Sequence, residues 1–188
     1  MKIAFSGVQC TGKTTIINEL RNIKEFDKYL FCVEGIRSLQ KQGFQINENG
    51  NNETQVAVMI LHLMNLDKGE NLILDRCLLD GMSYAEWSYN KGKINEETYK
   101  LCKRLFYKHI DDLDVIFYLV PEFEMVEDGT RSVNKIYRDE VKKIFDKYVD
   151  EIKSEFHKVN VIPLSGTVIE RVNQVKNIVN VTDFFRAR

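Results

Sequence analysis

An apolar, strand-like segment, Lys2–Ser6, runs directly into a glycine-containing turn that is followed at once by a helix-like segment. The turn reads Gly-Val-Gln-Cys-Thr-Gly-Lys-Thr over residues 7–14 and matches the pattern G-x-x-x-x-G-K-[ST]. After it, Ile16, Ile17 and Leu20 recur at helical spacing, as on the buried face of a helix. A strand, a glycine turn and a helix in this order predict a loop whose backbone surrounds phosphate groups.

The fixed positions of the pattern each have a physical role in such a loop. Gly7 and Gly12 let backbone N–H groups point toward phosphate oxygens, and the helix N-terminus adds the positive end of its dipole. Lys13 supplies charge to the β- and γ-phosphates, and the Thr14 hydroxyl is a ligand for Mg²⁺. The alternative is a glycine turn with a solvated lysine. We predict that ATP and Mg²⁺ bind at Gly7, Gln9, Cys10, Thr11, Gly12, Lys13, Thr14 and Thr15.

Beyond the loop, short apolar runs alternate with helix-period segments, the signature of an α/β fold with a mostly parallel sheet. The runs are apolar almost throughout, as expected of strands that helices cover on both faces. Strands are predicted at Lys2–Ser6, Tyr29–Val33, Asn71–Asp75, Val115–Val120 and Val159–Leu164. Helices are predicted at Lys13–Lys24, Thr54–Leu66, Leu79–Tyr89, Glu96–His109, Asn134–Phe156 and Thr167–Val179.

An acidic residue, Asp75, ends the third predicted strand and is followed directly by Arg76. Ligands of open parallel sheets bind at this edge, so Asp75 is placed to orient the Mg²⁺ shell or to accept a proton from an incoming hydroxyl. Arg76 is a candidate for substrate binding, and Asp80 is another. The alternative is structural: Asp75 caps the next helix, Arg76 pairs with a neighbouring acid, and Asp80 is a first-turn helix acid.

A second carboxylate, Glu34, follows the second predicted strand and precedes Arg37 by three residues. In a doubly wound sheet this strand end also opens toward the substrate, next to the loop after the first strand. Glu34 is thus a candidate to hydrogen-bond or deprotonate a substrate hydroxyl, with Arg37 as a substrate-binding neighbour. The alternative is an exposed acid that pairs with Arg37 one turn on.

A polar stretch without periodicity, Glu122–Val133, leads into a long predicted helix and has the features of a loop that covers a site. If the helix is continuous from Arg131, then Arg131, Lys135 and Arg138 point to one side. Such a cluster suits phosphoryl transfer, because charge builds up on the transferring group. We therefore predict a lid at about residues 121–138, with Arg131 and Arg138 as catalytic residues. The alternative is a solvated face that contributes little.

Composition excludes several other classes of protein. The 27 Lys and Arg nearly balance the 28 Asp and Glu, so the chain has no strong overall positive potential that would attract nucleic acid or an anionic membrane. Apolar runs are too short for a transmembrane helix, and the N-terminal segment is too short for a signal peptide. The four cysteines are widely spaced, which predicts a reduced, cytoplasmic protein without a zinc site. The 188 residues fit one domain at 1–179 with a C-terminal tail at 180–188.

Together, the phosphate loop, the two strand-end acids and the arginine-bearing segment resemble the nucleoside and nucleotide kinase branch of P-loop proteins. The resemblance is closest to ATP-binding proteins and kinases similar to nicotinamide riboside kinase. Those carry Glu-x-x-Arg after the second strand, then Asp-Arg-x-x-x-Asp, and a lid reading Asp-Gly-x-Arg-Ser. Here these motifs are Glu34 with Arg37, Asp75-Arg76 with Asp80, and residues 128–132. The resemblance implies a P-loop kinase fold, with a central five-stranded parallel sheet flanked by helices, and ATP·Mg²⁺ as the donor.

These features predict an ATP-dependent kinase of a small nucleoside- or nucleotide-like molecule, phosphorylated on a hydroxyl or a phosphate. Glu34 or Asp75 would activate or orient this acceptor, and Arg76 and Arg37 would hold it. Three other functions stay open. One is a kinase of a hydroxymethylated base within DNA, which needs a basic groove and binds with a strong salt dependence. Another is a regulatory ATP-binding or ATPase module without a small-molecule acceptor. The third is a nucleotide-gated interaction protein.

Overall fold

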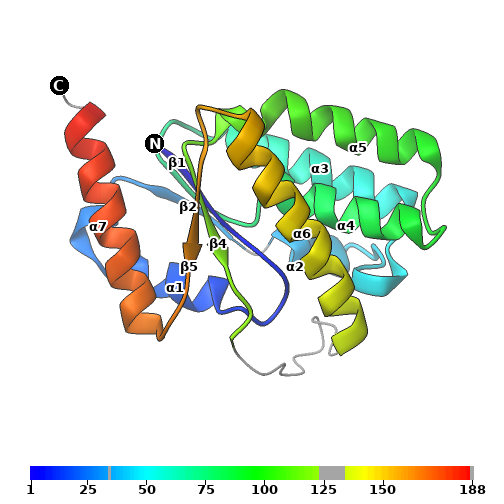
Figure 1. Cartoon of the computed structure of the whole chain (residues 1–188), viewed down its shortest axis with the longest axis horizontal. Helices are drawn as coiled ribbons and strands as arrows, with labels where there is room; N and C mark the ends of the chain where they lie inside the picture. The colour runs from blue at the N-terminus through cyan, green and yellow to red at the C-terminus, as the bar shows by residue number, and fades with distance from the viewer. Residues whose placement is uncertain (34, 123–133, 187–188) are drawn as a thin grey trace.

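A five-stranded parallel sheet forms the centre of the computed structural model, which describes residues 1–33, 35–122 and 134–186, with 181–186 described by backbone alone (Figure 1). Its order is β2-β3-β1-β4-β5, and every neighbouring pair is parallel. The strands are β1 (Lys2–Ser6), β2 (Leu30–Cys32), β3 (Leu72–Asp75), β4 (Val115–Leu119) and β5 (Asn160–Leu164). Each lies within its predicted segment, so the predicted α/β fold with a five-stranded parallel sheet is confirmed.

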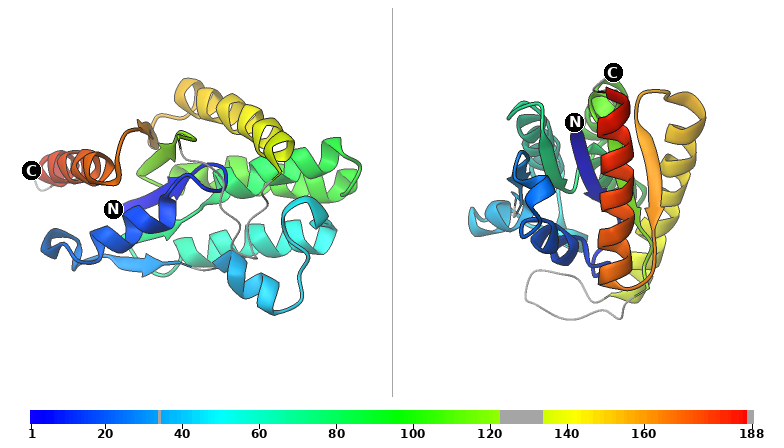
Figure 2. Two further views of the ribbon diagram at one scale, coloured as in Figure 1. Left: turned by 90° about the horizontal axis from the view of Figure 1, so that it is seen from below. Right: turned by 90° about the vertical axis from the view of Figure 1, so that its left-hand side faces the viewer.

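Helices cover both faces of the sheet (Figure 2). They are α1 (Lys13–Leu20), α2 (Gly35–Lys41), α3 (Asn52–Leu66), α4 (Leu78–Asn90), α5 (Glu96–His109), α6 (Lys135–Glu155) and α7 (Val168–Arg186), with short turns η1 (Lys24–Phe26), η2 (Asn47–Asn49) and η3 (Ile110–Asp112). Helices α1 and α7 pack on one face, and α3 to α6 on the other. Along β1, Ile3 and Phe5 accordingly face α1 and α7, whereas Ala4 faces the other helices.

Some boundaries differ from the prediction, and α2 is absent from it. Helix α1 ends at Leu20 instead of Lys24, because Ile23 has extended backbone. Helix α7 continues to Arg186 beyond the predicted end at Val179, since no Gly or Pro follows to stop it. Helix α2 buries only Leu39, so it lacks the apolar periodicity that marks a helix in a sequence.

The position of β2 also differs from the prediction. Strand β3 lies between β2 and β1, so the end of β2 is not next to the loop that follows the first strand. All four cysteines are free and buried, which agrees with the reduced state predicted for them. Within the described part of the chain, no helix has the length and apolar character needed to cross a membrane.

A buried carboxylate joins three helices on one face of the sheet. Glu86 on α4 is 9% exposed and accepts hydrogen bonds from Lys147 Nζ at 2.8 and 2.9 Å. It also accepts from the hydroxyls of Tyr99 on α5 and Tyr148 on α6. Burial by itself would raise the pKa of Glu86, but these donors outweigh it and lower the pKa.

We expect Glu86→Gln to lower the free energy of unfolding by about 2 kcal/mol at neutral pH, because charge-assisted hydrogen bonds become neutral ones. The wild-type advantage should be full above the unfolded-state pKa of about 4.3. It should disappear as the pH falls through the lower folded-state pKa. Urea titrations across this range measure the difference, with the exposed Glu19→Gln as control. If the difference in unfolding free energy between wild type and Glu86→Gln does not change with pH, the charge of Glu86 is not its cause.

Candidate active site

The loop between β1 and α1 adopts backbone conformations that require its two glycines. Gly7 has φ +137°, and a Cβ at this position would lie 2.9 Å from the carbonyl oxygen of Leu119 at the end of β4. Gly12 has φ +86° and directly precedes α1. A side chain at position 7 would therefore be strained and would also collide with backbone. The loop has the strand–turn–helix geometry that the sequence predicts.

Backbone strain is concentrated around one pocket beside this loop. Among the described residues, three non-glycine residues have positive φ: Cys10 at 57°, Asn47 at 56° and Arg76 at 78°. All three line the same pocket, here called the loop pocket, which is formed by residues 9–14, 35–37, 46, 47, 75 and 76. Strained backbone of this kind is found mainly where a site must keep a fixed shape.

Lys13 ties the phosphate loop together from inside. Its side chain is buried, and its ammonium donates to the carbonyl oxygens of Gly7 and Val8, both at 2.7 Å, and to Thr11 Oγ1 at 3.1 Å. An ammonium group has three donors, and these three acceptors match them. Lys13 must therefore exchange at least one loop acceptor for a phosphate oxygen when it binds a nucleotide.

Thr14 and Asp75 meet at the edge of the sheet. The Thr14 hydroxyl donates to Asp75 Oδ2 at 2.7 Å. This contact follows from the topology, because β3 pairs with β1 and both strands end at the same edge. Mg²⁺ prefers oxygen ligands and takes only one or two from protein, the others coming from phosphates and water. A hydroxyl and a carboxylate side by side at the phosphate loop fit this ion, and they are the residues that would hold it.

No other metal site competes with this pair within the described ranges. There, no group of three or more His, Cys, Asp or Glu side chains is arranged to hold a metal ion. The donor set at Thr14 and Asp75, one hydroxyl and one carboxylate, suits an ion that arrives with phosphates. It is not a site built to hold a metal by protein ligands alone.

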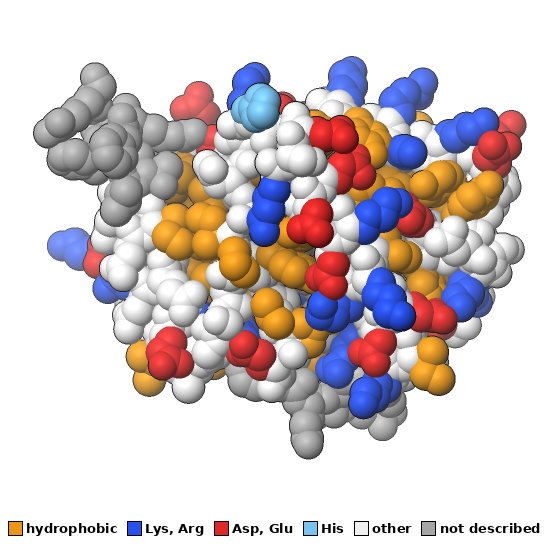
Figure 3. Space-filling model, viewed as in Figure 1, with side chains coloured by type: hydrophobic (Ala, Val, Ile, Leu, Met, Phe, Trp, Pro, Cys, Tyr) orange, Lys and Arg blue, Asp and Glu red, His pale blue; other side chains and the backbone are white. Residues whose placement is uncertain are grey.

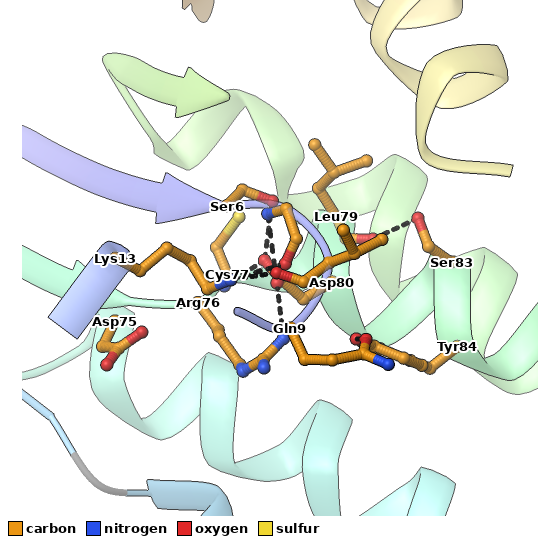
Figure 4. Close-up of polar contacts among 12 residues, drawn as sticks. Ser6, Gln9, Lys13, Asp75, Arg76, Cys77, Leu79, Asp80, Ser83 and Tyr84 are labelled. Carbon is orange, nitrogen blue, oxygen red and sulfur yellow. Dashed lines mark hydrogen bonds and ion pairs between the residues drawn. The ribbon is translucent and has the colours of Figure 1, made fainter. Parts of the chain in front are cut away.

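Asp80 links α4 to the phosphate loop (Figure 4). Its Oδ1 accepts from Arg76 Nη1 at 3.0 Å and from the backbone N–H of Gly7 at 3.4 Å. Its Oδ2 accepts from Ser6 Oγ at 2.7 Å and from the backbone N–H of Cys77 at 3.1 Å, which completes the capping box of α4. Asp80 is 1% exposed, so this carboxylate orients Arg76 and the loop from a buried position.

Arg76 is held as a permanent cation at the mouth of the loop pocket. Burial acts to lower its pKa, but Tyr84, Asp80 and Asp75 outweigh burial and raise it. The guanidinium also lies over the ring of Tyr84, with 5.6 Å between Cζ and the ring centroid. Arg76 is therefore positioned to bind an anionic or polar group between the loop pocket and a second pocket beside it.

This second pocket adjoins the loop pocket and lies among α3, α4 and α6. Both pockets are bordered by Ile36, Ile46, Asn47 and Arg76. The second one, here called the helix pocket, is also lined by Thr54, Gln55, Val58, His62, Asp80, Gly81, Tyr84 and Tyr137. A molecule that occupies both pockets would have one end near Thr14 and Asp75 and the other end between the helices.

The other predicted site residues are placed unevenly. Arg37 on α2 borders the loop pocket, whereas Thr15 is exposed on α1 and is not among the described residues that line it. Arg138 is half-buried on α6 and is not among the described residues that line either pocket. Glu34 and Arg131 lie outside the described residues.

The long helix that bears Arg138 is not continuous from Arg131. Helix α6 begins at Lys135, because Asn134 has extended backbone and caps the helix by accepting a hydrogen bond from the N–H of Tyr137 at 3.1 Å. The single helical face expected for Arg131, Lys135 and Arg138 therefore lacks its structural basis. Most of the predicted lid, residues 123–133, lies outside the described residues.

Arg171 on α7 supports the phosphate loop, although no motif includes it. Its side chain is 0% exposed, and Nη1 donates to the carbonyl oxygen of Thr11 at 2.7 Å. Nη2 donates to Glu122 Oε2 at 2.6 Å, and the same oxygen accepts from the N–H of Gly166 at 2.8 Å. The available sequence signal is its spacing: Arg171 lies four residues before Val175 on the buried face of α7.

A family model described as AAA domain matches residues 2–171, which include every described residue of both pockets. The chain belongs to this AAA domain family. No curated protein matches the chain in sequence.

Solved structures show which fold this AAA domain has. Deoxyadenosine kinase from M. mycoides, with dCMP and a flexible dCDP bound, superposes with a TM-score of 0.71 at 20% identity, over 97% of this chain and 100% of that one. Thymidylate kinase from Candida albicans superposes with a TM-score of 0.66 at 14% identity, over 96% of this chain and 91% of that one. A NadR protein in complex with NR superposes with a TM-score of 0.68 at 19% identity, over 93% of this chain and 50% of that one. The predicted P-loop kinase fold is confirmed, and with it the resemblance to nucleoside and nucleotide kinases.

In this AAA domain, we expect Arg171→Met to weaken ATP binding by about tenfold, because the carbonyl of Thr11 loses a buried charge-assisted donor. Arg171→Lys should restore part of the affinity, since it can keep one hydrogen bond. Calorimetric titration with ATP measures the effect, and the exposed Arg104→Met is the control. An unchanged affinity for ATP would mean that Arg171 contributes to packing but not to nucleotide binding.

Proposed function

We propose that the protein transfers the γ-phosphoryl group of ATP to a hydroxyl or phosphate of a small nucleoside- or nucleotide-like acceptor. The observation that carries this proposal is the junction of the two pockets. ATP in the loop pocket would place its terminal phosphate beside Thr14 and Asp75, and an acceptor in the helix pocket would reach the same point past Arg76. This arrangement brings donor and acceptor together, which is the main requirement of phosphoryl transfer.

The residues at this junction divide the work of the reaction. The phosphate loop and Lys13 would bind the β- and γ-phosphates, and Mg²⁺ held by Thr14 and Asp75 would offset the charge on them. Asp75 lines the loop pocket beside Thr14, so we propose it as the group that orients or deprotonates the acceptor, together with or in place of Glu34. Arg76, fixed by Asp80, and Arg37 would hold the acceptor. Arg131 and Arg138 remain proposed as cations that approach the transferred group.

A base within DNA is less well supported as the acceptor. Duplex or single-stranded DNA binds along continuous basic surfaces. On the face drawn in Figure 3, Lys and Arg side chains alternate with Asp and Glu. Several are paired along α6, as in Lys142 with Asp146 at 2.6 Å and Lys91 with Glu140 at 2.8 Å. The sequence as a whole carries a net charge of −1. These features favour a small acceptor in the helix pocket.

A transfer screen with γ-labelled ATP tests the proposal. The purified protein is incubated with Mg²⁺ and, separately, nucleosides, nucleotides, and an oligonucleotide that contains a hydroxymethylated base. Label is expected in a nucleoside or nucleotide, in amounts equal to the ADP formed. Label in the oligonucleotide, lost at high salt, would favour the DNA acceptor. ADP release that none of these compounds stimulates would favour a regulatory ATPase.

A further inference from the structure

The helix pocket is lined by both apolar and polar side chains. Its lining includes the aliphatic residues Ile46 and Val58 and the aromatic residues Tyr84 and Tyr137. Tyr84 also reaches the phosphate loop, because its hydroxyl donates to Gln9 Oε1 at 3.3 Å. Aliphatic and aromatic side chains next to the proposed reaction centre suit an aromatic ring better than a sugar or a phosphate.

Four polar side chains that line this pocket are almost completely buried, and they include His62 at 3% and Gln55 at 4% exposure. Neither His62 Nε2 nor Gln55 Oε1 has a hydrogen-bond partner among the described residues. Gln55 lines the pocket, and its Nε2 donates to Ser88 Oγ at 3.3 Å, which leaves the amide oxygen of the same side chain without a donor. Buried polar atoms are nearly always paired in folded proteins, so two unpaired ones in one pocket point to a missing partner.

The packing of α3 against α4 fixes these side chains in place. A Cβ at Gly81 on α4 would lie 2.5 Å from Met59 Sδ and 3.3 Å from His62 Cδ2, so glycine at this position leaves the space that these two side chains occupy. Burial also lowers the pKa of His62 to about 4, which keeps the imidazole neutral at physiological pH. A neutral imidazole presents one donor and one acceptor nitrogen, as a recognition group for an uncharged ring requires.

We propose that His62 and Gln55 recognise the amino-bearing edge of an aromatic nitrogen heterocycle carried by the acceptor. Gln55 Oε1 would accept an N–H from that edge, and His62 Nε2 would pair with the adjacent polar atom. The acceptor class is therefore a nucleoside-like molecule whose heterocycle carries an amino or carboxamide group. This inference rests on the proposed function, because it takes the helix pocket to be the acceptor site.

Matched acceptors that differ in one amino group test the inference directly. The pairs are adenosine with purine riboside, cytidine with zebularine, and nicotinamide riboside with acetylpyridine riboside. For the pair that the wild-type protein phosphorylates, kcat/KM should be at least about tenfold higher for the amino-bearing member, because its partner leaves Gln55 Oε1 unpaired. Equal rates within that pair would overturn the proposal.

Variants then assign this preference to the two side chains. In Gln55→Leu and in His62→Leu the preference should fall toward unity, and His62→Gln should keep part of it because a polar group remains. The exposed Met64→Leu on the same helix is the control and should keep all of it. Melting temperatures identify variants that fail to fold. A preference that survives both leucine substitutions in folded protein would contradict the inference.

A binding experiment separates this inference from the proposed function. Calorimetry measures the affinity of adenosine, cytidine and nicotinamide riboside for the wild-type protein and the variants, without turnover. If no compound is phosphorylated but one binds and loses at least about tenfold in affinity in Gln55→Leu and His62→Leu, the recognition site stands and the kinase proposal fails. If transfer occurs and a crystal structure with the acceptor shows water between His62 and Gln55 in place of the heterocycle, the recognition site fails alone.

Discussion

Replacing Lys13 with alanine is expected to lower phosphoryl transfer by at least about 10³-fold, since the substitution removes a positive charge that the transition state needs in a site shielded from water. The lysine lies within the phosphate loop, where its ammonium donates hydrogen bonds to the carbonyl oxygens of Gly7 and Val8. Steady-state assays with the acceptor found in the transfer screen measure the loss. The exposed Lys100→Ala, on the far helix α5, should behave as wild type.

The loop contacts of Lys13 make a second measurement necessary. Alanine also removes three hydrogen bonds inside the loop, so part of the effect will be a less ordered loop. Lys13→Arg keeps the charge but has a longer, planar head, and Lys13→Met keeps the length without the charge. If charge is the main factor, Lys13→Met should be nearly as inactive as Lys13→Ala, although it keeps the length of the side chain. Wild-type turnover in Lys13→Met would refute the phosphate-loop assignment.

The second large effect is expected for Asp75→Asn. The amide keeps the size of the side chain and an oxygen that can accept from Thr14, but it removes the charge. Transfer should fall by at least about 100-fold, the usual range for lost acid–base assistance, while ATP binding is retained. If Asp75 also holds the Mg²⁺, the concentration of Mg²⁺ at half-maximal rate should rise.

The Mg²⁺ titration is what distinguishes the two roles of Asp75. A lower rate with an unchanged Mg²⁺ requirement would leave only the acceptor role, and a rate restored by excess Mg²⁺ would leave only the metal role. Asp67→Asn, an exposed acid at the end of α3, provides the matched control. Unchanged transfer in Asp75→Asn would contradict both roles.

The sequence predicts the centre of this site better than its surroundings. The loop at residues 7–14, the buried strands and the strand-end Asp75 are all encoded locally, in short segments whose meaning does not depend on distant residues. Their meeting at one sheet edge then follows from parallel topology. For this reason the proximity of Thr14 and Asp75 is predictable from the sequence alone.

What the sequence does not predict depends on long-range packing. Arg171 is 160 residues from the carbonyl that it binds, and nothing near it in the chain identifies its partner. Asp80 is predicted to bind substrate, but in the structure it accepts hydrogen bonds from Ser6 and Gly7. These residues are 74 and 73 positions away in the sequence, so the local pattern around Asp80 does not predict the contacts. The unpaired state of His62 and Gln55 likewise becomes visible only when the helices around them are in place.

The left-handed backbone at Cys10, Asn47 and Arg76 lowers the stability of the folded protein, and favourable interactions elsewhere in the fold must offset this loss. Each such residue costs roughly 1–2 kcal/mol, and the stability of an ordinary domain is only about 5–15 kcal/mol. Glycine at these positions would relax the chain and would also loosen the rim of the loop pocket. Selection for heat resistance and selection for turnover should therefore favour different residues at these three positions, and the most heat-resistant form of this protein should not be its fastest.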